Sequence, residues 1–217
     1  MPHTRASFKQ NRIRTFFLSF ESSPKKKDSV EEIKEEIEKT GLTYIQMRLP
    51  VEKITPEFEA KLNDKLEHNI LHAKIRESTK EDLENVMNIY NKAWLTSNTP
   101  FSQISVESLK EIYEFPDTVI LIAKVYGIDA GFIILDYEGS NREYGIIAGL
   151  GILPRFQRRG LATILGLSAW KYFKEKGVRE LRCEVYTENK ASYNFIKLLG
   201  FEEFGKKTYK VDGFINE

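Results

Sequence analysis

Residues 151–163 contain the residue types that bind a phosphate group. An apolar run ends at Pro154, Arg158 and Arg159 follow, and Gly160 precedes an amphipathic stretch. That order predicts a strand, a turn and a helix N-terminus, where backbone N–H groups have no partner within the helix and carry partial positive charge. Glycine lets a ligand approach these groups closely, and arginine adds full charge. The segment predicts a turn that binds the pyrophosphate of a nucleotide-type cofactor. An ordinary strand-to-helix connection with solvated arginines is the alternative.

The residues after this turn predict a second strand and a second helix. Apolar and polar residues alternate over 181–185, after a helix predicted over 161–175. A short helix after Asn189 ends at Gly200, which can adopt the left-handed conformation of a helix C-terminus. Two strand–helix units in tandem imply neighbouring parallel strands, and ligands of such sheets bind beyond the carboxyl ends of the strands. Asn189 and the basic turn both lie at those ends.

These segments resemble the conserved motifs of the GNAT superfamily, the Gcn5-related N-acetyltransferases. The run Gln157-Arg158-Arg159-Gly160-Leu161-Ala162 is similar to the family's Gln/Arg-x-x-Gly-x-Gly/Ala motif, and residues 152–154 match the end of its fourth strand. The segment from Asn189-Lys190-Ala191 to Leu199-Gly200-Phe201 resembles its Asn-x-x-Ala … Leu-Gly-Phe segment. The resemblance covers residues 74–211. It implies an α/β acyl-CoA N-acyltransferase fold with a mixed sheet, formed by a strand, two helices, three meandering strands, a helix, a strand, a helix and closing strands.

By this resemblance, acetyl-CoA is the cosubstrate and its pyrophosphate binds the basic turn. The pantetheine arm would run between the strands at 144–152 and 181–186, where parted strands leave backbone groups available. Gly149 and Gly151 within the first strand indicate either a bulge or close backbone approach, or only packing room. Asn189 is expected to bond the pantetheine or the acceptor, to cap its helix, or both. The cofactor-binding residues implied by the resemblance are Leu150, Ile152, Gln157, Arg158, Arg159, Gly160, Leu161, Ala162, Thr163 and Asn189.

Acetyl transfer requires a neutral amine, and an α-amine or a lysine is mostly protonated at pH 7, so a base or a water relay is useful. Glu184 is the candidate base, with a surface or salt-bridged role as the alternative. In much of the family, a tyrosine four residues before the glycine of the Leu-Gly-Phe motif protonates the CoA thiolate, but this chain has Ile196 there. Tyr193, close to the same helix face, is the candidate substitute. The alternatives are a packing role for Tyr193 and proton donation by water.

The remaining cysteine and histidine residues predict neither a nucleophile nor a metal site. Cys183 lies on the apolar side of a strand without an adjacent histidine, so we expect a core residue. His68 and His72 are four apart, but His72 is expected to follow the end of its helix, so no metal is predicted. A single cysteine suits a reducing cytoplasm, and no apolar run reaches the length of a membrane span. The apolar residues 16–20 are followed by lysines, which does not predict a signal peptide.

The chain is predicted to consist of an extension of unknown role over residues 1–70 and a GNAT-like domain over 71–217. The extension reads as a β-α-β-α unit, with strands over 15–20 and 43–49 and helices over 30–40 and 56–68. In the second part, a closing pair of strands is predicted over 201–204 and 207–211, on either side of Gly205.

The predicted function is acetyl-CoA-dependent transfer of an acetyl group to a primary amine of a small molecule or of a peptide or protein N-terminus. The alternative is a catalytically weak or inactive acyl-CoA-binding module with an interaction role. The net charge of +1 gives no reason to expect a nucleic acid or a membrane surface as partner. A homodimer is an open alternative, since nothing in the sequence determines the oligomeric state, and the sequence does not identify the acceptor.

Overall fold

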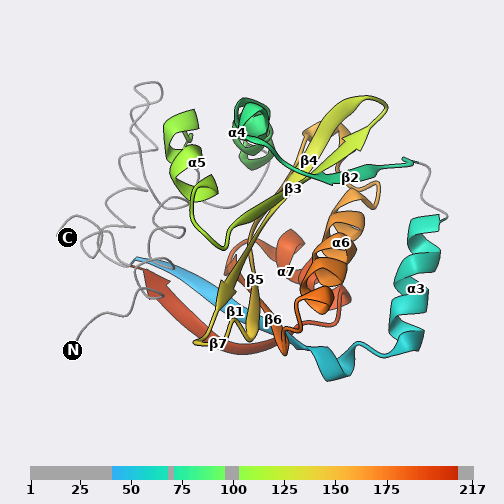
Figure 1. Ribbon diagram of the computed structural model, residues 1–217. Helices are drawn as coiled ribbons and strands as arrows, with labels where there is room; N and C mark the ends of the chain where they lie inside the picture. Colours follow the sequence, from blue (N-terminus) through green and yellow to red (C-terminus); the bar gives the residue numbers. More distant parts are fainter. Residues whose placement is uncertain (1–40, 68–70, 96–102, 210–217) are drawn as a thin grey trace.

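The protein is described by a computed structural model that covers residues 41–67, 71–95 and 103–209. Its centre is a seven-stranded sheet with the order β2-β3-β4-β5-β6-β1-β7 (Figure 1). The strands are β1 (Leu42–Pro50), β2 (Lys74–Glu77), β3 (Val119–Val125), β4 (Ile128–Glu138), β5 (Tyr144–Ile152), β6 (Glu180–Tyr186) and β7 (Glu202–Tyr209). The helices are α3 (Pro56–Glu67), α4 (Leu83–Trp94), α5 (Val106–Tyr113), α6 (Leu161–Glu175) and α7 (Lys190–Leu198), with short 3-10 turns η1 (Val51–Lys53), η2 (Lys80–Asp82) and η3 (Pro154–Phe156). The strand predicted over 15–20 and the helix predicted over 30–40 lie outside the described residues.

Helices cover both faces of the sheet, and each face has its own apolar core. Helices α4 and α5 pack on one face of β3 and β4, against a cluster that includes Ile120, Phe132 and Ile134 (Figure 1). On the opposite face α6 packs on residues such as Leu121 and Leu135, with α3 and α7 beside it. The predicted order of elements from residue 74 to Phe201 is confirmed. Among the helices of the described ranges, none is long and apolar enough to cross a membrane.

Strand β1 lies inside the sheet, between β6 and β7, and is antiparallel to both. The prediction of a closing pair over 201–204 and 207–211 is wrong, because residues 202–209 form the single strand β7 and its partner is β1. Gly205 was interpreted as a turn but lies within β7 opposite Gln46, where an added Cβ would be 2.8 Å from Gln46 Oε1. The glycine makes room for a neighbouring side chain. The segment before residue 70 therefore supplies an internal strand to the sheet.

The parallel strands β5 and β6 part near the middle of the sheet. Their last paired residues are Ile147 and Cys183. Strand β5 also shifts register against β4 at this level, which leaves Ala148 as an extra residue in β5. A bulge of this kind bends a strand locally. The result is an opening between β5 and β6 toward their carboxyl ends, where ligands of such sheets bind.

Candidate functional site

The turn before α6 presents backbone N–H groups. Gly160 is the N-cap of the helix in the left-handed conformation, with φ 84°, and Arg158 is also left-handed, with φ 58°. The first helical hydrogen bond runs from Ile164 N to Gly160 O, at 3.1 Å. The helix itself therefore provides no acceptor for the N–H groups of residues 161–163, and no acidic side chain occupies this first turn. Such a helix start suits an anion.

The side chain of Gln157 fastens this turn to the end of β5. Its Nε2 donates to the carbonyl oxygen of Ile152 at 3.0 Å, and its backbone N–H donates to Pro154 O at 3.2 Å. The turn is thus held in shape by the protein alone. In the sequence Gln157 was expected to act through its N–H group, but its amide side chain has a structural contact as well.

A cavity of about 880 Å³ extends from this turn through the opening between β5 and β6. Its lining comes from both faces of the sheet, which makes the opening a passage between the side of α6 and α7 and the side of α4. The sequence-predicted residues that line it are Leu150, Ile152, Gln157, Arg158, Gly160, Leu161, Ala162, Thr163, Glu184 and Asn189. Arg159 and Tyr193 are not among the lining residues.

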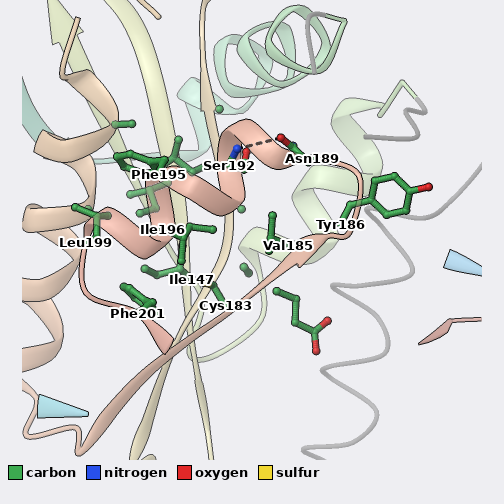
Figure 2. Close-up of a pocket in the computed structure, with 18 of the residues that line it drawn as sticks. Ile147, Cys183, Val185, Tyr186, Asn189, Ser192, Phe195, Ile196, Leu199 and Phe201 are labelled. Atoms are coloured by element: carbon green, nitrogen blue, oxygen red, sulfur yellow. Dashed lines mark hydrogen bonds between the residues drawn. The ribbon is translucent and has the colours of Figure 1, made fainter. Parts of the chain in front are cut away.

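The first turn and inner face of α7 form one wall of the cavity. Asn189 Oδ1 accepts from Ser192 N at 3.1 Å, so the helix cap expected at this residue is present (Figure 2). Phe195 and Ile196 line the same cavity from α7, and Figure 2 shows them on the side of Ile147. This wall is apolar, which suits the aliphatic part of a pantetheine arm.

Gly151 and Cys183 both have packing roles. A Cβ on Gly151 would lie 2.5 Å from Phe132 Cε1, so the glycine provides packing room, and the extra residue of β5 is Ala148 instead. Cys183 is buried, and burial raises the pKa of its thiol, as expected of a core residue. Within the ranges that the structure describes, no group of three or more His, Cys, Asp and Glu side chains could hold a metal ion. His68 lies outside those ranges.

Tyr193 is directed away from the cavity. Its hydroxyl donates to Glu203 Oε1 on β7, and this hydrogen bond raises the pKa of Tyr193. Ile196 lines the cavity from the position where the related motif has tyrosine. Spacing along the helix placed Tyr193 near that face, but the contact with β7 turns the side chain elsewhere.

Residues on strands β1 and β7 hold the Glu184 carboxylate in place. Its Oε1 accepts from Gln46 Nε2 at 3.0 Å, and its Oε2 accepts from the Tyr209 hydroxyl at 2.8 Å. Both donors line the cavity, and sequence reasoning missed them. The available signal was the alternation over 43–49, in which polar positions share one face of a strand. The missed lining residues with polar or aromatic side chains include Tyr44, Gln46, Trp94, Asp136, Glu138, Arg182, Tyr186 and Tyr209.

Comparisons with known protein sequences find similar proteins. A sequence profile described as the Acetyltransferase (GNAT) family matches residues 83–201. An uncharacterized N-acetyltransferase of Methanocaldococcus jannaschii is 29% identical over 136 residues, which make up 59% of this chain. The chain spans 60% of the length of that curated relative.

Solved structures show the same fold. A PaiA N-acetyltransferase from Thermoplasma acidophilum, in complex with coenzyme A, is 23% identical with a TM-score of 0.52, over 63% of this chain and 99% of that one. An aminoglycoside acetyltransferase from an uncultured soil metagenomic sample, in complex with sisomicin, is 16% identical with a TM-score of 0.54, over 64% of this chain and 95% of that one.

Proposed function

Because the chain belongs to the GNAT family of acetyltransferases, we propose that it transfers the acetyl group of acetyl-CoA directly to a primary amine. The observation that carries this proposal is the passage between β5 and β6, which begins past the Ile147–Cys183 pair and connects to the N-terminus of α6. One end of the passage suits a pyrophosphate. The other end opens on a polar face that can receive an amine. The two substrates would therefore meet between the strands.

The cofactor would bind through backbone groups along this passage. Its pyrophosphate would accept from the N–H groups of residues 161–163, with Arg158 contributing charge. The pantetheine amides would form hydrogen bonds with the backbone of β5 past Ile147, where β6 no longer pairs with it. A backbone N–H between Leu150 and Ile152 would polarise the thioester carbonyl, an interaction that strengthens as negative charge develops on that oxygen.

Proton transfer in this scheme uses Glu184. The amine nitrogen forms a bond to the acetyl carbon, the bond from carbon to sulfur breaks, and the amine proton passes to Glu184 directly or through water. The sulfur must then gain a proton. Ile196 cannot donate one, and the Tyr193 hydroxyl contacts Glu203 outside the cavity, so we assign this step to water.

A coenzyme A-binding module without turnover is the second candidate function, and Ile196 is the observation that favours it. Measuring thiol release from acetyl-CoA with a panel of amines separates the two. The panel should contain polyamines, an aminoglycoside and peptides with a free N-terminus, because relatives of this fold include an aminoglycoside enzyme. Amine-dependent release supports the transferase. Tight coenzyme A binding without release from any amine favours the module.

The segment over residues 1–70 would take part in acceptor binding. Strand β1 contributes Tyr44 and Gln46 to the cavity on the side away from α6, which supports this role. Tyr44→Ala, which alters the part of β1 that lines the cavity, should change acceptor choice and preserve affinity for coenzyme A. A reducing cytoplasm stays a prediction from the single cysteine, which is buried as Cys183.

A further inference from the structure

We propose that Gln46 and Tyr209 are positioning residues that hold the Glu184 carboxylate at the point where the amine loses its proton. The inference rests on the function proposed above. Gln46 and Tyr209 both lie outside residues 83–201, the part of the chain that the family profile matches. The site would thus be completed by strands from the two ends of the described chain.

The hydrogen bonds to Glu184 on β6 come from the adjacent strand β1 and from β7, the strand beyond it. Gln46 is directly opposite Glu184 in the antiparallel pairing of β1 with β6, so its amide reaches Oε1 along the face of the sheet. Tyr209 pairs with Leu42 at the far side of β1, and its hydroxyl spans that strand to reach Oε2. Each carboxylate oxygen therefore accepts at least one hydrogen bond, which restricts rotation of the group.

Packing around these donors restricts them in turn. The Tyr209 ring stands edge-on to the Tyr44 ring at a centroid distance of 5.7 Å, and the Tyr44 ring lies 5.7 Å from the Tyr186 ring. Gln46 lies over Gly205, where any side chain would meet its Oε1. The observed conformation of Gln46 therefore requires glycine at position 205 of β7.

The location of Glu184 brings its carboxylate close to the reacting atoms of the proposed mechanism. Glu184 follows Cys183, the last residue of β6 that pairs with β5, and its side chain lies on the face of β1 residues Tyr44 and Gln46. The carboxylate therefore stands where the strands part and where the thioester would lie. Other titratable groups on this face, from the elements packed around it, are Arg182 and Tyr186 on β6, Tyr44 and Arg48 on β1, Lys207 and Glu202 on β7, Asp136 and Glu138 on β4 and Tyr90 on α4.

Two substitutions remove the donors and preserve side-chain size: Gln46→Met and Tyr209→Phe. Each should lower kcat for acetyl transfer about tenfold, the usual effect of losing a hydrogen bond to a charged group. The loss should appear in kcat, while the KM for acetyl-CoA and the calorimetric Kd for coenzyme A stay unchanged. A merely structural role would not confine the loss to kcat.

Gly205→Ala provides an independent test, since it displaces the Gln46 amide without altering Gln46 or Glu184. It should reproduce the lowered kcat and the unchanged KM for acetyl-CoA of Gln46→Met. Tyr113→Phe is the matched control, because the Tyr113 hydroxyl donates to Ser78 O far from the cavity. Its kinetics should equal those of the wild type.

The outcomes separate this inference from the function on which it rests. If the wild type releases thiol with an amine and the two donor variants keep its kcat, Gln46 and Tyr209 do not position Glu184. If the wild type binds coenzyme A and acetylates no amine, the proposed function fails and the inference fails with it.

Discussion

Gly160 and Gly177 close the two ends of helix α6 in the same left-handed conformation, with φ 84° and φ 72°. At the C-terminus Gly177 N donates to Lys174 O at 3.1 Å and Val178 N donates to Phe173 O at 3.3 Å, so the final carbonyl groups are satisfied. At the N-terminus Gly160 turns the backbone so that the first N–H groups face the cavity. The same backbone conformation thus has a structural use at one end, and the proposed function gives it a binding use at the other.

Gly160→Ala should weaken coenzyme A binding by at least about tenfold, because a Cβ crowds the ligand and strains the left-handed turn. The strain should also lower the free energy of unfolding by about 1–2 kcal/mol. Calorimetry measures the Kd, and denaturant unfolding measures the stability. Gly177→Ala is the matched control, since an added Cβ meets nothing within 4 Å there. It should lose similar stability with an unchanged Kd. Equal Kd values for both variants would contradict a binding role for Gly160.

The local sequence predicted the turns whose backbone conformation depends on a glycine and a few adjacent residues. Gly200 adopts φ 90° after α7 and its N–H donates to Lys197 O at 2.9 Å, as predicted from the glycine at this helix end. The turn at Gly160 was found in the same way. In both cases a glycine and its immediate neighbours specify the backbone, so no knowledge of distant residues was needed.

The position of β1 could not be predicted from local pattern. The alternation over 43–49 predicted a strand, and Met47 and Leu49 are buried as that pattern requires. The alternation does not predict which strands lie beside β1. A two-residue period determines which side chains share a face of the strand, and not which strand is its neighbour. Pairing with Glu184 across 138 residues of sequence depends on the whole sheet. For this reason the sequence identified Glu184 as a candidate but missed Gln46 and Tyr209.

Asn189 should show separable effects on stability and on binding. Asn189→Ala removes the acceptor for Ser192 N and should cost about 1 kcal/mol of unfolding free energy. Asn189→Ser keeps an oxygen that can cap the helix, so it should recover most of that loss. If the amide also bonds the cofactor or the acceptor, kcat/KM should stay low in the serine variant. Full recovery of both quantities would restrict Asn189 to the cap.

The start of α4 should be stable only while Asp82 is ionised. Arg76 donates to both Asp82 oxygens, at 2.6 and 2.7 Å, and this pairing holds the pKa of Asp82 well below its usual range. Because the pKa is lower in the folded state, the contribution to stability is present above the ordinary value of about 4 and is lost as the pH falls toward the folded value. The difference in unfolding free energy between the wild type and Asp82→Asn should be larger at pH 6 than at pH 3. A difference that does not change with pH would exclude this linkage.

The adjacent arginines of the basic turn should differ in their contribution to cofactor binding. Both side chains are exposed, but Arg158 lines the cavity and Arg159 does not. Arg158→Gln should therefore raise the Kd for coenzyme A about tenfold at low salt, and Arg159→Gln should raise it by a smaller factor. Because screening weakens charge–charge attraction, the penalty of Arg158→Gln should shrink between 50 mM and 500 mM salt. Calorimetry at both salt concentrations measures this. A larger effect of Arg159→Gln would mean that the phosphate groups lie outside the passage, on the exposed side of the turn.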